Sequence, residues 1–277
     1  MDKTLLLYEL KVPIDKLEKA SQQETAFFLR AMSVLNDISI LQKAVLHSNA
    51  AMPPNNPNTP ETSAQLAQSF CFIRMLAGIC CETFNFMQVG FFANPGEPPN
   101  KRKLEKIKKL KLQSLVDIFI PTMSKEAKDA NEKIQSYFSK SNLLKRLRNK
   151  FAFHYDLEQA FSQRKKLEII NDPHILLEEV DGNCCYVLSQ QLMMLHALEI
   201  QKDDQNELRG KFEKLIDEVT SLAHAFSTFL NAYVLIYSQK YLAIDTLNPP
   251  KIKLENVSFF DEIRTPFFLK YRKDNNK

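Results

Sequence analysis

Glycine is scarce in this sequence, with 5 in 277 residues, and the cysteines do not have the pattern of a disulfide framework. Tight turns between strands depend on glycine, so its scarcity argues against a fold built mainly of strands and turns. The five cysteines are Cys71, Cys80, Cys81, Cys184 and Cys185. An odd number that includes adjacent pairs fits neither disulfides nor the spacing of a zinc knuckle. We therefore expect buried thiols in a reducing compartment.

The sequence also lacks a strong excess of charge and an uninterrupted apolar run. The net charge of +4 is below the level at which charge alone indicates nucleic-acid binding. The apolar part of residues 1–9 is too short for a signal peptide. The longest apolar stretch, residues 66–92, is interrupted by Arg74, Glu82, Asn85 and Gln88, which favours a buried helix over a membrane span. We expect a cytoplasmic protein without a membrane partner.

Two long helices are predicted near the start of the chain. Apolar residues recur at spacings of three and four from residue 22 to residue 51, as on one face of a helix. Thr59 followed by Pro60 is a typical helix start. The helix from 61 to 93 is apolar nearly all round, so we expect it to be covered on every side at the centre of a bundle.

The remaining periodicity predicts more helices and one small β element. Helices are expected over residues 101–118, 121–140, 142–163, 189–201 and 205–241. Short strands are expected at Leu167–Ile170, Ile175–Val180 and Cys184–Leu188, with a hairpin turn at Asp181–Asn183.

These elements predict a mainly α fold in one domain, 1–277, in which a β-hairpin is inserted into a bundle of long antiparallel helices. Its parts are the core helices (22–163), the short strands (164–188), the C-terminal helices (189–247) and an extended arm (248–277).

One short segment carries residues suited to chemistry. Arg148 and Asn149 are followed by four residues and then by His154 on a predicted helix. At 100° per residue, both Arg148 and His154 flank the apolar stripe that includes Leu147, whereas Phe153 points away from it. Aromatic residues on two sides suggest that the helix is covered on two sides, by its own core and by a second surface. Arg148 and His154 would lie at the boundary between these two surfaces.

This motif resembles that of the HEPN family, helical ribonucleases and toxins in which a late helix carries arginine, four to six residues and histidine. The resemblance implies a HEPN-like bundle and a homodimer in which two motifs meet in one cleft, with Phe153 at the dimer interface. It implies cleavage of RNA without metal or cofactor, in a toxin or defence role, and products with a 2′,3′-cyclic phosphate. Asp156 stands where HEPN toxins that are silenced by a partner nucleotidyltransferase have tyrosine, so that regulation is not expected. The regulator stays unknown.

The residue types of the motif suit this chemistry. His154 can exchange a proton near neutral pH, and Arg148 can bind two phosphate oxygens. Asn149 can orient either the histidine or the phosphate. One histidine per chain is too few for separate acid and base roles, and a dimer supplies the second.

A second candidate is the concentration of positive charge before residue 112. It can be a phosphate-contacting ridge for RNA or the solvated face of a helix, and both can hold at once. Binding to a membrane surface is a minor third option. Its members are Lys101, Arg102, Lys103, Lys106, Lys108, Lys109 and Lys111.

Other polar residues have structural interpretations. Arg74 and Glu82 are expected to be paired or hydrogen-bonded inside the bundle. Asp37 is a polar break in an apolar stripe. The remaining histidines lack metal-ligand spacing, so no metal site is predicted. A non-enzymatic HEPN-like scaffold and an RNA-binding accessory protein that uses residues 101–111 remain alternatives to the ribonuclease.

Overall fold

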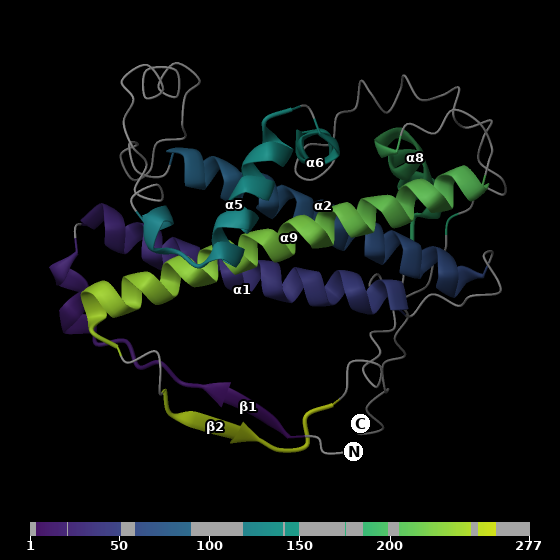
Figure 1. Cartoon of the computed structure of the whole chain (residues 1–277). Coiled ribbons are helices and arrows are strands. Elements are labelled where there is room, and N and C mark those ends of the chain that lie inside the picture. The colour runs from purple at the N-terminus through teal and green to yellow at the C-terminus, as the bar shows by residue number, and fades with distance from the viewer. Residues whose placement is uncertain are drawn as a thin grey trace, which may run out of the picture. The chain divides into compact units, whose positions relative to one another are not determined.

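The computed structural model describes residues 4–20, 22–50, 59–89, 119–140, 142–149, 175, 185–198, 205–244 and 249–258. This part of the chain is a mainly helical bundle with a small antiparallel sheet (Figure 1), which confirms the expected helical class. Its elements are β1 (Leu5–Tyr8), η1 (Ile14–Lys19), α1 (Gln22–Ala50), α2 (Pro60–Val89), η2 (Ile120–Thr122), α5 (Lys125–Phe138), α6 (Leu143–Leu147), α8 (Val187–Ala197), α9 (Gln205–Leu242) and β2 (Lys251–Leu254).

The chain divides into two compact units, and each of the long helices α1, α2 and α9 contributes residues to both. Unit 1 takes its described residues from 1–40, 79–142 and 220–258. Unit 2 takes its described residues from 41–78 and 143–219.

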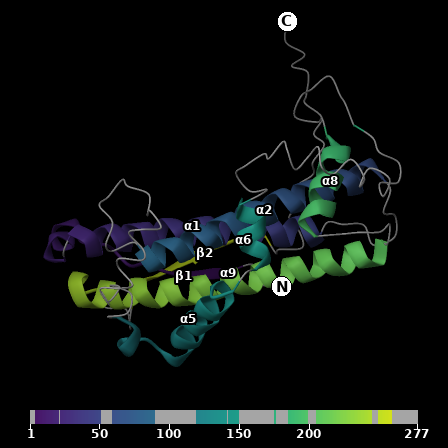
Figure 2. The same cartoon turned by 90° about the horizontal axis from the view of Figure 1, so that it is seen from above.

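Unit 1 has an aromatic core. The ring of Phe27 stacks on Phe86 with 4.2 Å between centroids and meets the ring of Tyr233 edge-on at 4.7 Å. Phe28 stacks on Tyr237 at 4.2 Å. The start of α1 therefore packs against the end of α2 and the end of α9, so in this unit α1 is antiparallel to both. Figure 2 shows the three helices from above.

Two tyrosines of α9 differ in how their hydroxyl groups are satisfied. Thr25 Oγ1 donates its hydrogen to the Leu17 carbonyl at 3.1 Å, so Tyr237 is the donor in its 3.1 Å bond to Thr25. The hydroxyl of Tyr233 is fully buried and has no hydrogen-bond partner among the described residues. Burial raises the pKa of Tyr233, and so do the neighbouring Tyr237, Glu24 and Tyr241.

We expect Tyr233→Phe to raise the free energy of unfolding by about 1 kcal/mol. The change removes a buried hydroxyl group whose hydrogen bonds to water are lost on folding. The matched variant Tyr237→Phe should lower it by about 1 kcal/mol, because a hydrogen bond is lost. Urea unfolding of both variants measures the difference. If Tyr233→Phe is the more damaging change, the Tyr233 hydroxyl has a partner outside the described residues.

In unit 2, the end of α1 lies beside the start of α2. Gln65 Nε2 donates to the Ser48 carbonyl at 2.9 Å, and both residues are buried. The N-terminal end of α2 is capped as expected, since Thr59 Oγ1 accepts from the Thr62 amide at 3.2 Å.

Two expectations for the helices are wrong. Helix α2 is not covered on every side, because Met75, Glu82 and Asn85 are exposed along one line at spacings of seven and three. The helix expected to begin at Pro121 begins at Lys125, because Ser124 caps α5 by accepting from the Ala127 amide at 3.3 Å.

The sheet that the structure describes lies where no strand was predicted. Strands β1 and β2 pair antiparallel, with Leu5 opposite Leu254 and Tyr8 opposite Lys251. The expected strand Cys184–Leu188 is wrong at its end, because Val187 and Leu188 begin helix α8. Apart from Ile175, the expected strands at 167–170 and 175–180 lie outside the described residues.

Two helices are long and apolar enough to cross a membrane by length and composition alone, over Pro60–Met87 and Arg209–Leu242. In the most apolar window of each, 56% and 44% is buried inside the protein. The core helices of soluble proteins meet the same criterion, so these stretches do not decide the location, and the cytoplasm stays a prediction.

Candidate functional site

The motif begins on helix α6 of unit 2. Leu144 and Leu147 are fully buried, one helical turn apart, and fix the face of α6 that packs inward. Residues 148–149 continue the helix with the wider π-type turn. Such turns are rare and are frequently found at functional sites. Arg148 and Asn149, the first two residues of the motif, lie in this turn.

Arg148 and Asn149 form a pair of side chains. Arg148 Nη1 donates to Asn149 Oδ1 at 2.9 Å, with Arg148 half-buried and Asn149 exposed. This bond uses the acceptor oxygen of the amide, so its NH₂ group points away from the guanidinium. Both the guanidinium of Arg148 and the NH₂ group of Asn149 carry N–H donors, which are the groups that bind phosphate and carboxylate.

Arg146 ties α6 to helix α8 in the same unit. Its Nη2 donates to the carbonyl of Ala197 at 3.1 Å. Ala197 is the last residue of α8, where carbonyl groups have no partner within the helix and the helix dipole is negative. No local pattern predicts this contact, because the two residues are 51 positions apart.

Most of the other predicted site residues belong to parts of the chain that the structure does not describe. His154 and Phe153 lie outside the described residues, as does the whole basic run, Lys101, Arg102, Lys103, Lys106, Lys108, Lys109 and Lys111. The structure therefore describes two of the three predicted catalytic residues. Within the described ranges, no group of three or more His, Cys, Asp or Glu side chains could hold a metal ion.

The polar residues of the long helices are only partly as expected. Arg74 is buried, with its guanidinium carbon 5.3 Å from the centre of the Phe70 ring. Glu82 is exposed, so the expectation that it is enclosed in the bundle is wrong. Asp37 is exposed as well.

The cysteines behave as apolar residues where the structure describes them. Cys80, Cys81 and Cys185 are buried free thiols, as predicted, and Cys71 is partly exposed. Burial, followed by the neighbouring Cys81, raises the pKa of Cys80. A thiol in that state is a poor nucleophile, so we assign Cys80 to packing.

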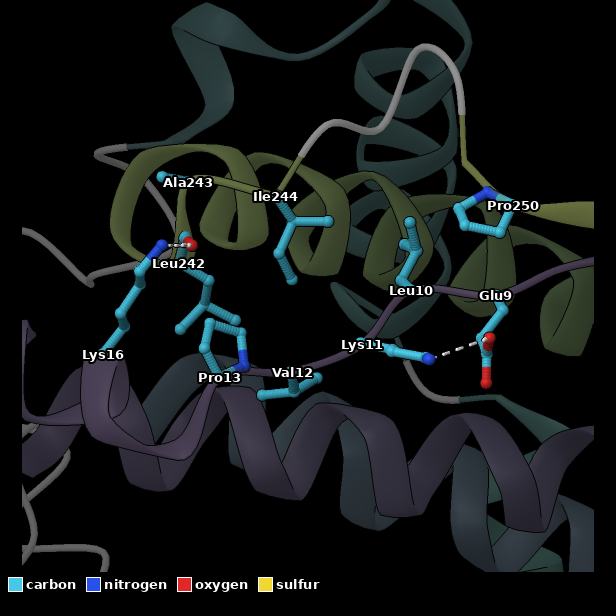
Figure 3. Close-up of a pocket in the computed structure, with 10 residues that line it drawn as sticks. All are labelled: Glu9, Leu10, Lys11, Val12, Pro13, Lys16, Leu242, Ala243, Ile244 and Pro250. Atoms are coloured by element: carbon cyan, nitrogen blue, oxygen red, sulfur yellow. Dashed lines mark hydrogen bonds and ion pairs between the residues drawn. The ribbon is translucent and has the colours of Figure 1, made fainter.

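Unit 1 contains an open pocket of about 390 Å³ between residues 9–16 and the end of α9 (Figure 3). Lys16 Nζ donates to the Leu242 carbonyl at 3.2 Å, and Lys11 lies 3.9 Å from the Glu9 carboxylate. Lys16, which contacts the C-terminal end of α9 from η1, satisfies a terminal carbonyl of that helix and interacts favourably with its dipole. No motif residue lines this pocket, and we assign its charges to structure.

Comparisons with protein-family models, with curated proteins and with solved structures find no match. A function for this chain therefore has to come from its own residues.

Proposed function

We propose that this chain is a metal-independent endoribonuclease of HEPN type that acts as a homodimer. The observation that carries the proposal is the hydrogen bond from Arg148 to Asn149 at the end of helix α6, whose Leu144 and Leu147 are buried. The helical bundle is compatible with the family that the motif resembles.

The proposed chemistry divides among three residues. Arg148 neutralises the phosphate as negative charge builds up in the transition state. Asn149 donates from its NH₂ group to a phosphate oxygen. His154 takes the proton from the 2′-hydroxyl, and its counterpart in the second subunit protonates the leaving 5′-oxygen. The bond between phosphorus and the leaving 5′-oxygen breaks as the bond between phosphorus and the 2′-oxygen forms. The products are a 2′,3′-cyclic phosphate and a 5′-hydroxyl.

The dimer and the basic run belong to the same proposal. Phe153 contacts the second subunit, which brings two motifs into one cleft. The lysines and the arginine of residues 101–111 bind the RNA backbone, and binding should therefore weaken as salt is raised.

We expect purified protein to cleave total RNA or transfer RNA equally well with and without EDTA, because no step uses a metal. Gel electrophoresis of the RNA measures cleavage, and light scattering at the same concentration gives the mass of the active species. Cleavage that EDTA abolishes and a divalent ion restores would contradict the mechanism. A protein that binds RNA without cutting it would favour an RNA-binding accessory role.

A further inference from the structure

The ribbon formed by β1 and β2 has an outer edge along β2 that the described part of the chain does not cover. The sheet has only these two strands within the described residues, and all of their side chains are exposed. A two-stranded ribbon alone is marginally stable in water. Unpaired edge strands are ready to pair with a further strand.

The backbone groups on this edge can be identified from the register. The Glu9 amide donates to the Pro250 carbonyl at 2.9 Å, and the two residues continue the register of the ladder. Hydrogen-bonded pairs alternate with non-bonded pairs along an antiparallel ladder, so Ile252 also bonds toward β1. The N–H and C=O groups of Lys251 and Lys253 therefore point outward, away from β1.

The side chains along β2 divide by face. Lys251 and Lys253 share one face, and the Lys251 ammonium lies 5.8 Å from the centre of the Tyr8 ring. Ile252 and Leu254 share the other face, each 40% exposed. A strand added beside β2 would meet lysines on one face and aliphatic side chains on the other.

We propose that the outer edge of β2 binds an extended peptide that alternates acidic and aliphatic residues. The carboxylates would lie beside Lys251 and Lys253, and opposite charges on neighbouring strands attract. The aliphatic residues would extend the Ile252–Leu254 face, and the backbone would supply the main hydrogen bonds. Lys253 Nζ lies 3.1 Å from Glu255, but both side chains are more than half exposed, and such surface pairs contribute little.

The test is a titration of the full chain against a short labelled peptide of alternating glutamate and valine, followed by fluorescence anisotropy. We expect saturable binding that weakens with salt. The double variant Lys251→Glu, Lys253→Glu should lose about tenfold or more in affinity and should instead bind the matching lysine–valine peptide. Lys214→Glu, an exposed lysine on α9, is the control and should bind like the wild type.

A second pair of variants tests the backbone contact. Lys253→Pro removes an outward N–H without taking a donor from the β1 ladder, whereas Lys253→Ala removes the charge alone. Proline should abolish binding, alanine should only weaken it, and circular dichroism checks that both fold. Equal binding by Lys253→Pro and Lys253→Ala, or no saturable binding by wild type, would overturn the proposal. Displacement of the peptide by an RNA oligonucleotide at lower concentration than by unlabelled peptide would also overturn it.

Discussion

Replacing His154 with alanine is expected to slow RNA cleavage by about 100-fold or more and to leave the helical content unchanged. His154 is the one group in the motif able to transfer protons near neutral pH. Arg148 and Asn149 would remain, so RNA binding should survive. Initial cleavage rates, with circular dichroism and RNA-binding titrations on the same samples, measure the three properties separately.

His224→Ala is the matched control, because His224 is an exposed histidine on α9. It should cleave RNA at the wild-type rate. Equal rates for the His154→Ala variant and wild type would remove His154 from the mechanism. Loss of helical content in the His154→Ala variant would instead assign His154 to folding, as a structural histidine of a non-enzymatic bundle.

Replacing Phe27 with alanine is expected to lower the free energy of unfolding by about 3–5 kcal/mol. Phe27 is 2% exposed, and its ring contacts Phe86 on α2 and Tyr233 on α9. Deletion of the ring leaves a cavity at the point in unit 1 where three helices meet. Urea unfolding followed by circular dichroism measures the loss.

Leu29→Ala on the same helix is the control, because Leu29 is 49% exposed. Its effect should stay within about 0.5 kcal/mol. Similar effects for the two variants would mean that Phe27 is not at the centre of the core of unit 1.

The long helices could be predicted from the sequence because each has a sustained apolar period. Helix α1 was expected over 22–51 and spans Gln22–Ala50, and α9 was expected over 205–241 and spans Gln205–Leu242. Composition was less informative about which face of a helix meets water. Helix α2 is apolar enough to suggest full burial, yet Met75, Glu82 and Asn85 are exposed.

The sheet could not be predicted, because its information is not local. Leu5–Tyr8 has four apolar residues without alternation, and its partner Lys251–Leu254 is far along the chain. Whether a segment forms a strand depends on how its side chains pack against those of the neighbouring strand, and the sequence does not identify that neighbour. The same limit applied at Val187, where a β-branched residue after two cysteines looked like a strand but opens α8.

The side-chain contacts around the motif go beyond what the sequence predicts. The sequence identifies Arg148 and Asn149 as neighbours, but it does not show that their side chains hydrogen-bond to each other after α6. The contact from Arg146 to Ala197 depends on how α8 packs in unit 2, which no local pattern contains. The side chains that a fold brings together are therefore the part of a site that sequence patterns miss.

The most direct test of the proposed activity is the chemical end left on cleaved RNA. We expect wild-type protein in EDTA to leave 2′,3′-cyclic phosphate ends, identified by mass spectrometry of a short synthetic RNA. A matched substrate with a 2′-deoxy sugar at the cleavage site should stay intact, because it lacks the attacking hydroxyl. Products that end in a 3′-hydroxyl, cleavage of the deoxy substrate, or no cleavage of any RNA would contradict a HEPN-type ribonuclease.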